Sequence, residues 1–203
     1  MANLNAPTGL SPVSDANGKP WSGAVRYYYH ASGDSQAIYI GDLVTATGDT
    51  VLVNIGGVVQ SIPIVAQSAT GDVFQGVCTG AIAQTRDSPT YGAASTGVIL
   101  AVCDDPDALF AVQDVSTGTP LTPNAIGLNV NVLVNQGSTI TGLSAMVLNN
   151  GTEADTNTLD LKIVGQLQSP GNDLGTDATT GAASGTWLVR INRHRFVNQV
   201  AGI

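Results

Sequence analysis

The stretch PTGLSPVSDANGKPWSGAVRYYYHASGDSQAIYIGDLVTATGD, residues 7–49, decides the fold of this chain. Its first part carries proline and glycine with little apolar periodicity, whereas aromatic and β-branched residues follow in short runs at 26–29 and 37–44. Gly-Asp pairs separate these runs, and such pairs favour tight turns. An extended segment that leads into short strands and turns is typical of an all-β protein.

Short apolar runs separated by turn residues continue along the rest of the chain. They predict strands at 24–30, 37–40, 43–45, 51–54, 58–65, 73–83, 97–103, 109–112, 127–134, 159–167 and 187–197. Alternation within two of these strands predicts outward-facing side chains, namely Asp160 and Lys162 in one and Arg190, Asn192 and His194 in the other. The only helix-like segment is 104–109. So many short strands indicate an all-β jelly-roll or a related β-sandwich or barrel.

Two segments are expected to serve as contact elements. Residues 1–23 form an extended N-terminal arm ahead of a β-sandwich body at 24–203, and residues 168–185 form a long loop in that body. Neither segment has the apolar periodicity to build a core of its own, so we expect both to become ordered against a partner. Deleting residues 1–20 is therefore expected to leave a folded body that has lost its partner.

The composition narrows the class of protein. The chain has 203 residues, of which 43% are hydrophobic and only 11% charged, against about a quarter charged in typical domains. Fifteen acidic residues against seven basic ones give a net charge of -8. Binding to nucleic acid needs phosphate-neutralising Lys and Arg, so we expect no nucleic-acid partner. No apolar run is long enough to cross a membrane and no signal-peptide core follows Met1, so we expect synthesis in the cytoplasm and no membrane partner.

Few residues suggest reactive chemistry. Cys78 and Cys103 lie in apolar strands without a CxxC partner, and we interpret them as buried free thiols rather than a disulfide or a zinc site. His30 ends a strand, and His194 lies between two arginines that would oppose its protonation. No nucleophile motif accompanies either histidine. We therefore expect no enzymatic activity, no catalytic residue and no cofactor.

The acidic cluster Asp104, Asp105 and Asp107 lacks the spacing of a calcium loop. A capped turn around Pro106 is the interpretation that we favour, and no metal site is expected. The carboxylates are also suited to contact a neighbour's arginine.

The basic and aromatic clusters leave two interpretations open. Arg190, Arg193 and Arg195 either protect a solvated sheet edge or contact acidic groups on a partner, where Arg forms paired hydrogen bonds. The aromatic residues at 27–29, with Trp21, either pack into the core or form an interface. A surface on which carbohydrate rings stack is a further alternative.

The order of several motifs resembles that of the head decoration, or cement, proteins of tailed bacteriophages. The motifs are the arm at 7–23, the strand and acidic-Pro turn VCDDPDALFAVQ at 102–113, GSTITGLSAM at 137–146, LKIVG at 161–165 with PGND at 170–173, and VRINRH at 189–194. Together they span most of residues 7–196. The long loop at 176–185 departs from the pattern.

The resemblance implies a structural virion protein that is made in the bacterial host and binds the outer capsid surface. Its partners would be the major capsid protein and further copies of itself, with a trimer as the expected oligomer, and it would act as a clamp that stabilises the shell. The residues expected to contact the capsid or a sister subunit are Pro7, Leu10, Pro12, Val13, Trp21, Arg190, Arg193 and Arg195. The alternative function is a virion-borne adhesin or receptor-binding domain that recognises glycans.

Overall fold

The computed structural model describes residues 3–115, 117–173 and 183–197, and the fold is all-β, as predicted. The strands are β1 (Ser11–Asp15), β2 (Arg26–His30), β3 (Leu43–Ile55), β4 (Val58–Gln67), β5 (Gly76–Ala81), β6 (Val98–Cys103), β7 (Ala108–Gln113), β8 (Asn129–Val130), β9 (Val132–Leu133), β10 (Val147–Leu148), β11 (Leu161–Gln166) and β12 (Thr186–Ile191). A 3-10 turn, η1, covers Pro123–Ala125. No helix within the described ranges is long and apolar enough to cross a membrane.

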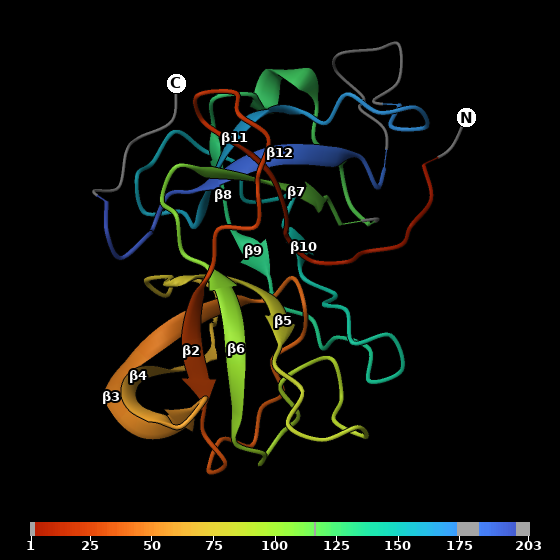
Figure 1. Cartoon of the computed structure of the whole chain (residues 1–203). Helices are drawn as coiled ribbons and strands as arrows, with labels where there is room; N and C mark the ends of the chain where they lie inside the picture. Colours follow the sequence, from red (N-terminus) through yellow and green to blue (C-terminus); the bar gives the residue numbers. More distant parts are fainter. Residues whose placement is uncertain (1–2, 116, 174–182, 198–203) are drawn as a thin grey trace.

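The strands form two main layers (Figure 1). Strands β2, β4, β3, β5 and β6 close into a small barrel, and β1, β7, β12, β11 and β8 form a five-stranded sheet above it. The short pair β9–β10 lies between them. Residues 104–107, expected as part of a helix, instead form the turn that carries the chain from barrel strand β6 to sheet strand β7. The helix-like segment does not form a helix, because Asp105 caps a tight turn, the interpretation favoured above for the acidic cluster: its Oδ1 accepts the backbone N–H of Asp107 at 2.9 Å.

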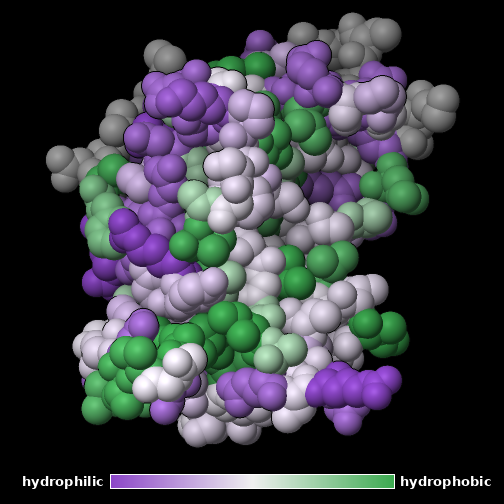
Figure 2. Space-filling view, viewed as in Figure 1, coloured by the Kyte–Doolittle hydropathy of each residue, from purple (hydrophilic) through white to green (hydrophobic). Residues whose placement is uncertain are grey.

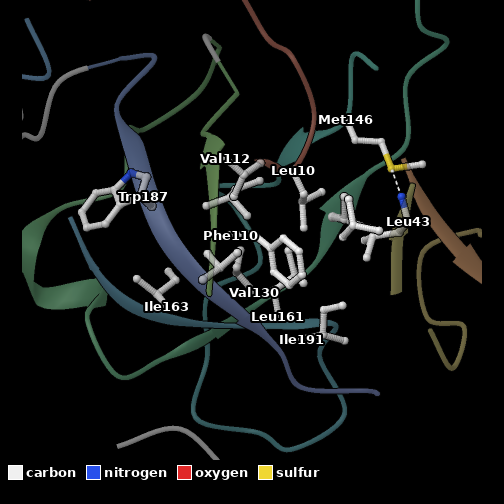
Figure 3. Packing of buried hydrophobic residues seen from close by; sticks show 14 of the residues in the cluster. Leu10, Leu43, Phe110, Val112, Val130, Met146, Leu161, Ile163, Trp187 and Ile191 are labelled. Carbon is white, nitrogen blue, oxygen red and sulfur yellow. Dashed lines mark hydrogen bonds between the residues drawn. The ribbon is translucent and has the colours of Figure 1, made fainter. Parts of the chain in front are cut away.

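One large apolar cluster joins the two layers (Figure 3). Phe110 and Trp187, from neighbouring strands of the sheet, are completely buried in it, and Leu43 enters from the barrel. Trp187, Val189 and Ile191 all face this core, as the alternation along β12 predicts. A second, smaller cluster fills the barrel around Leu100.

The predicted outward face of the last two strands needs correction. Asp160, Asn192 and His194 are buried, because loops from elsewhere in the chain cover them. The Asp160 carboxylate accepts the backbone N–H of Gly71 at 3.0 Å and that of Val132 at 3.1 Å. Asn192 donates to the backbone carbonyls of Asn157 and Leu159. Burial of Asp160 and Asn192 is tolerated because these backbone partners satisfy their side chains.

The N-terminal segment is largely part of the body rather than a separate arm. Residues 11–15 form β1, which pairs antiparallel with β7 at the edge of the five-stranded sheet. Leu10 is 1% exposed and points into the main core beside Val112 and Phe110 (Figure 3). A deletion of residues 1–20 would therefore remove a core side chain and an edge strand, so we now expect it to destabilise the body rather than leave it intact.

A close contact between two glycines fixes this segment. Gly9 and Gly41 both have positive φ angles, of 70° and 96°. A Cβ on Gly41 would lie 2.3 Å from the carbonyl oxygen of Thr8, and the backbone N–H of Leu10 donates to the Gly41 carbonyl at 2.9 Å. Only glycine fits this crossing, because a side chain would occupy the space of the other backbone.

The two cysteines are free and buried, as predicted. They lie on paired strands, Cys78 in β5 and Cys103 in β6, but belong to different apolar clusters. Burial raises the pKa of the Cys78 thiol to about 12, so this thiol is inert at neutral pH.

Candidate functional site

The acidic-Pro turn is held by arginines of the same chain. The Arg190 guanidinium donates to the Asp107 carboxylate at 2.7 Å and to the Pro106 carbonyl at 2.8 Å. Arg26 reaches Asp104 at 3.1 Å. Two motifs that lie far apart in the sequence, at 102–113 and 189–194, therefore pack together and stabilise the junction between barrel and sheet. The capped-turn interpretation of this acidic cluster is confirmed.

A buried hydrogen-bond chain lies behind this turn. The Tyr28 hydroxyl donates to Asp104 at 2.7 Å, and the Gln75 amide donates to the same hydroxyl at 2.9 Å. Burial, followed by the contact with the Asp104 carboxylate, raises the pKa of Tyr28 to about 12. This tyrosine therefore stays protonated and supports the structure, whereas Tyr27 on the opposite face of β2 is 52% exposed.

The other two predicted contact arginines also bind their own chain. Arg193 donates to the carbonyls of Asp72 and Thr158, at 3.1 and 2.8 Å. Arg195 is exposed and reaches the Ala46 carbonyl at 3.3 Å. Arg190 and Arg193 therefore hold loops of their own chain, and Arg195 contacts the backbone of strand β3. The geometry favours their structural role over a single cationic patch facing one partner.

The predicted contact residues of the N-terminal segment differ in exposure. Leu10 is buried, so the prediction that it contacts a partner is wrong: its side chain fills the core between the two layers. Val13 is 38% exposed, Pro7 and Pro12 are half-buried, and Trp21 packs against the edge of the main core. The backbone N–H of Trp21 donates to the Val13 carbonyl at 2.9 Å, so residues 13–21 fold back as a small hairpin along β1.

Both histidines are buried, and each contacts a neighbouring residue of its own chain. His30 lies 3.5 Å from Asp34, and the Nδ1 of His194 accepts the backbone N–H of Phe196 at 3.1 Å. Burial lowers the pKa of both imidazoles, which leaves them neutral at neutral pH. Within the described ranges, no group of three His, Cys, Asp or Glu side chains is arranged to hold a metal ion.

The structure brings together the two segments that the sequence marks as contact elements. The Asn3 amide donates to the carbonyls of Asp173 and Ala183, at 2.8 and 3.2 Å, and its Oδ1 accepts the Asp173 N–H at 2.9 Å. The Gln113 amide of β7 donates to the Leu4 carbonyl at 2.9 Å. We call residues 3–8, 166–173 and 183–186 the N-terminal surface. Residues 174–182 of the predicted loop lie outside the described residues.

The N-terminal surface is polar, almost uncharged and anchored from below. Asn172 fixes the base of the loop through hydrogen bonds with the backbone of Leu167 and Thr186 at 2.7–2.8 Å. Leu4 is 82% exposed above it. A shallow groove of about 230 Å³ runs beside Leu4, between the N-terminal segment and β7. An exposed apolar side chain on an anchored backbone is suited to contact another protein.

A buried carboxyl beside the N-terminal surface, that of Asp114, makes the free energy of unfolding of the chain depend on pH. Burial raises the pKa of Asp114 to about 6, from an ordinary value of 3.8, and its Oδ2 accepts the Leu121 N–H at 3.2 Å. Between these pH values the folded chain holds a proton that the unfolded chain has released. The free energy of unfolding therefore falls as pH rises from about 4 to about 6, by on the order of 1 kcal/mol per pH unit.

The variant Asp114→Asn keeps an acceptor for Leu121 and removes this titration. Urea unfolding at the two ends of that pH range should show a smaller fall in stability for Asp114→Asn than for the wild type. Because Asp42 and Asp160 also have raised pKa values through burial, the difference between the two proteins is the relevant quantity. Equal falls in both proteins would contradict the assignment to Asp114.

A pocket of about 440 Å³ opens on a different side of the molecule. Tyr39 and Tyr91 stack in its wall with ring centroids 4.8 Å apart. Its other lining side chains are small, aliphatic, or neutral hydrogen-bonding groups, including Gln36, Gln67 and Gln136. Aromatic rings beside neutral amides and hydroxyls suit an uncharged polar ligand better than an ionic one.

Comparisons with known proteins give no assignment: no protein-family model, no curated protein and no solved structure matches this chain.

The sequence analysis did not predict the contacts within the chain that form the N-terminal surface. Asn3 and Asp173 lie 170 positions apart, and no local pattern predicts that they meet. The buried state of Asp114 was missed too, although only Gln113 separates it from the apolar run 108–112, which is largely buried.

Proposed function

We propose that this chain is a structural virion protein that binds the outer surface of a phage capsid and stabilises the shell as a cement protein. The observation that carries the proposal is the N-terminal surface, in which the N-terminal segment and the long loop meet through Asn3. The resemblance to decoration proteins implies binding through the N-terminal segment, and the loop is an expected contact element because it lacks the apolar periodicity to build a core of its own. The major capsid protein is the partner, and no catalytic residue or cofactor takes part.

The mechanism is thermodynamic linkage. A protein that binds the assembled shell more tightly than its separated subunits stabilises the shell by mass action. Self-association, with a trimer as the expected oligomer, would link several weak contacts into one strong attachment. The low charge of the N-terminal surface suits such contacts, because few charges have to be desolvated.

The number of copies per purified virion, measured by quantitative mass spectrometry relative to the major capsid protein, tests this function. Hundreds of copies are expected, because a cement protein repeats with the lattice. A dozen or fewer would overturn the proposal and point to a tail or adhesion component.

Deleting residues 2–7 should separate binding from folding. This deletion removes Leu4 and the Asn3 contacts but keeps Leu10 and β1, so the free energy of unfolding should change by no more than about 1 kcal/mol. Binding to shells that lack this protein should weaken roughly tenfold or more, the equivalent of about 1.4 kcal/mol. Co-sedimentation with shells measures the binding, and urea unfolding measures the fold.

Two point variants test the same surface: Leu4→Asp is the test variant and Ile140→Asp is its matched control. Both place a charge at an exposed aliphatic side chain, 82% and 95% exposed, but only Leu4 belongs to the N-terminal surface. Leu4→Asp should weaken shell binding and Ile140→Asp should leave it unchanged. Unimpaired binding of the deletion variant would remove the N-terminal surface from the mechanism.

The second candidate is a virion-borne receptor-binding domain that recognises glycans. The pocket beside Tyr39 and Tyr91 favours it, because the partly exposed Tyr91 ring and the neutral amides are suited to sugar rings and hydroxyls. Tyr39 is buried and supports the Tyr91 ring from behind. A low copy number per virion together with retention on a glycan array would support this alternative.

A further inference from the structure

The β3–β4 hairpin extends beyond the barrel that it helps to form. Strand β3 pairs with β5 only at residues 43–44, and β4 pairs with β2 only at residues 64–65. The pairing between β3 and β4 is interrupted between Ala46 and Thr50 and then continues from Thr50↔Pro63 to Ile55↔Val58. Over residues 50–62 the two strands therefore pair only with each other (Figure 1).

The two faces of this projecting part differ. Directly paired residues lie on the same face of a hairpin. Val51, Val53 and Ile55 are half-buried, and Ile62 is buried, so their face turns toward the molecule. The other face is exposed along its whole length and consists of Thr50, Leu52, Asn54, Val59, Ser61 and Pro63. We call these six residues the outer face.

The outer face combines exposed apolar side chains with a complete lack of charge. Leu52 is 73% exposed and Val59 is 62% exposed, and they are diagonal neighbours across the hairpin. Val58 at the turn, which pairs with Ile55 on the other face, is also 58% exposed. Figure 2 shows an apolar patch over this hairpin, at the lower left. No charged residue occurs from Thr50 to Gly71, so the usual protection of an exposed strand edge by Lys or Glu is missing here.

Electrostatics favours a second copy of this chain as the partner. Two copies with a net charge of -8 each repel one another, and an interface between them is least costly where neither copy carries charge. The outer face meets this condition. Its open edges and β-branched side chains also allow one hairpin to pair or pack against its equivalent in another copy, as in other strand-edge associations. A strongly charged partner would find no complementary group on it.

We propose that the β3–β4 hairpin is the element through which copies of this chain associate. The hairpin lies at the end of the molecule away from β11 and β12 (Figure 1), so association through it leaves the N-terminal surface free. The inference deepens the proposed function, which supplies the expectation of an oligomer. Its surface is inferred from the pairing and exposure of the hairpin, and its partner from the absence of charge there on a chain of net charge -8.

Molar mass in solution tests the proposal. Analytical ultracentrifugation of the full-length chain should give a multiple of 20.6 kDa. The double variant Leu52→Asp/Val59→Asp should sediment as a monomer at the same concentrations, and the control Ile140→Asp should keep the wild-type mass. Near-UV circular dichroism checks that all three proteins are folded. A monomeric wild type, or a hairpin variant that stays associated, would overturn the proposal.

Cross-linking tests the same contact with a milder change. The native thiols Cys78 and Cys103 are buried, so an added exposed cysteine is the reactive one. Under oxidising conditions Val59→Cys should form a disulfide-linked dimer, and Ile140→Cys should stay uncross-linked. Equal cross-linking of the two variants would contradict the hairpin contact. Both experiments use purified protein without shells, so their failure is distinguishable from a failure of capsid binding.

Discussion

Phe110→Ala is expected to lower the free energy of unfolding by about 3–5 kcal/mol, the range measured for truncation of a fully buried phenylalanine. Phe110 is 0% exposed and lies at the centre of the main cluster (Figure 3). Its strand, β7, pairs with β1 on one side and β12 on the other, with Pro12 and Val189 opposite Phe110. Three strands therefore border the cavity that the variant creates, and none can collapse into it without breaking its ladder.

The matched control is Phe196→Ala, in which the same group is removed from a side chain that is 52% exposed. Phe196 lies 5.4 Å from the His194 ring and 5.9 Å from the Arg26 guanidinium, between group centres. Loss of these surface contacts should cost less than about 1 kcal/mol. Urea unfolding of both variants measures the difference. Similar losses for the two would show that the main cluster does not dominate the stability.

Gly41→Ala is expected to have the second large effect. The φ of 96° at this position is strained for alanine, which costs roughly 1–3 kcal/mol. In addition, the new Cβ would lie 2.3 Å from the Thr8 carbonyl oxygen, and relief of such a clash costs about another 1–3 kcal/mol. The N-terminal segment should shift away from the barrel, and the hydrogen bond from Leu10 to Gly41 should weaken.

Gly48→Ala separates the two contributions. Gly48 has nearly the same φ, 94°, but a Cβ there meets no atom within 4 Å. This variant should therefore show the backbone strain without the clash, and it should be clearly more stable than Gly41→Ala in urea unfolding. Limited proteolysis should cut near the N-terminus of Gly41→Ala faster than in Gly48→Ala. Equal stability would mean that the crossing of residues 8–10 over Gly41 relaxes without cost.

The Gly41 crossing also bears on function. Residues 3–8 of the N-terminal surface lead directly into the crossing over Gly41. Leu10, which follows the crossing, is buried in the core. A displaced segment would lose the arrangement of Asn3 over Asp173. Gly41→Ala is therefore expected to weaken shell binding as well as stability, whereas Gly48→Ala should weaken neither to the same degree.

The sequence by itself determined the fold class and most of the strands. Alternation of apolar and polar residues has a period of two in a strand, and this local signal located β2, β4, β6 and β11 to within a few residues. It also located the start of β12, which ends at Ile191 rather than at 197. Turn residues marked the connections between strands, and the low content of charged residues with the absence of reactive motifs led only to the expectation of a structural protein. Strands and turns can be predicted from the sequence because their signals come from residues that are close together along the chain.

Tertiary structure alone decided which polar residues are buried and which segments meet. Asp160 and Leu10 differ from their predicted places because loops and strands distant in sequence cover them: Gly71 and Val132 supply the donors for Asp160, and β7 with the barrel encloses Leu10. The N-terminal surface depends in the same way on Asn3 reaching Asp173. Periodicity describes only the two faces of one strand, whereas burial depends on what the rest of the chain places against each face.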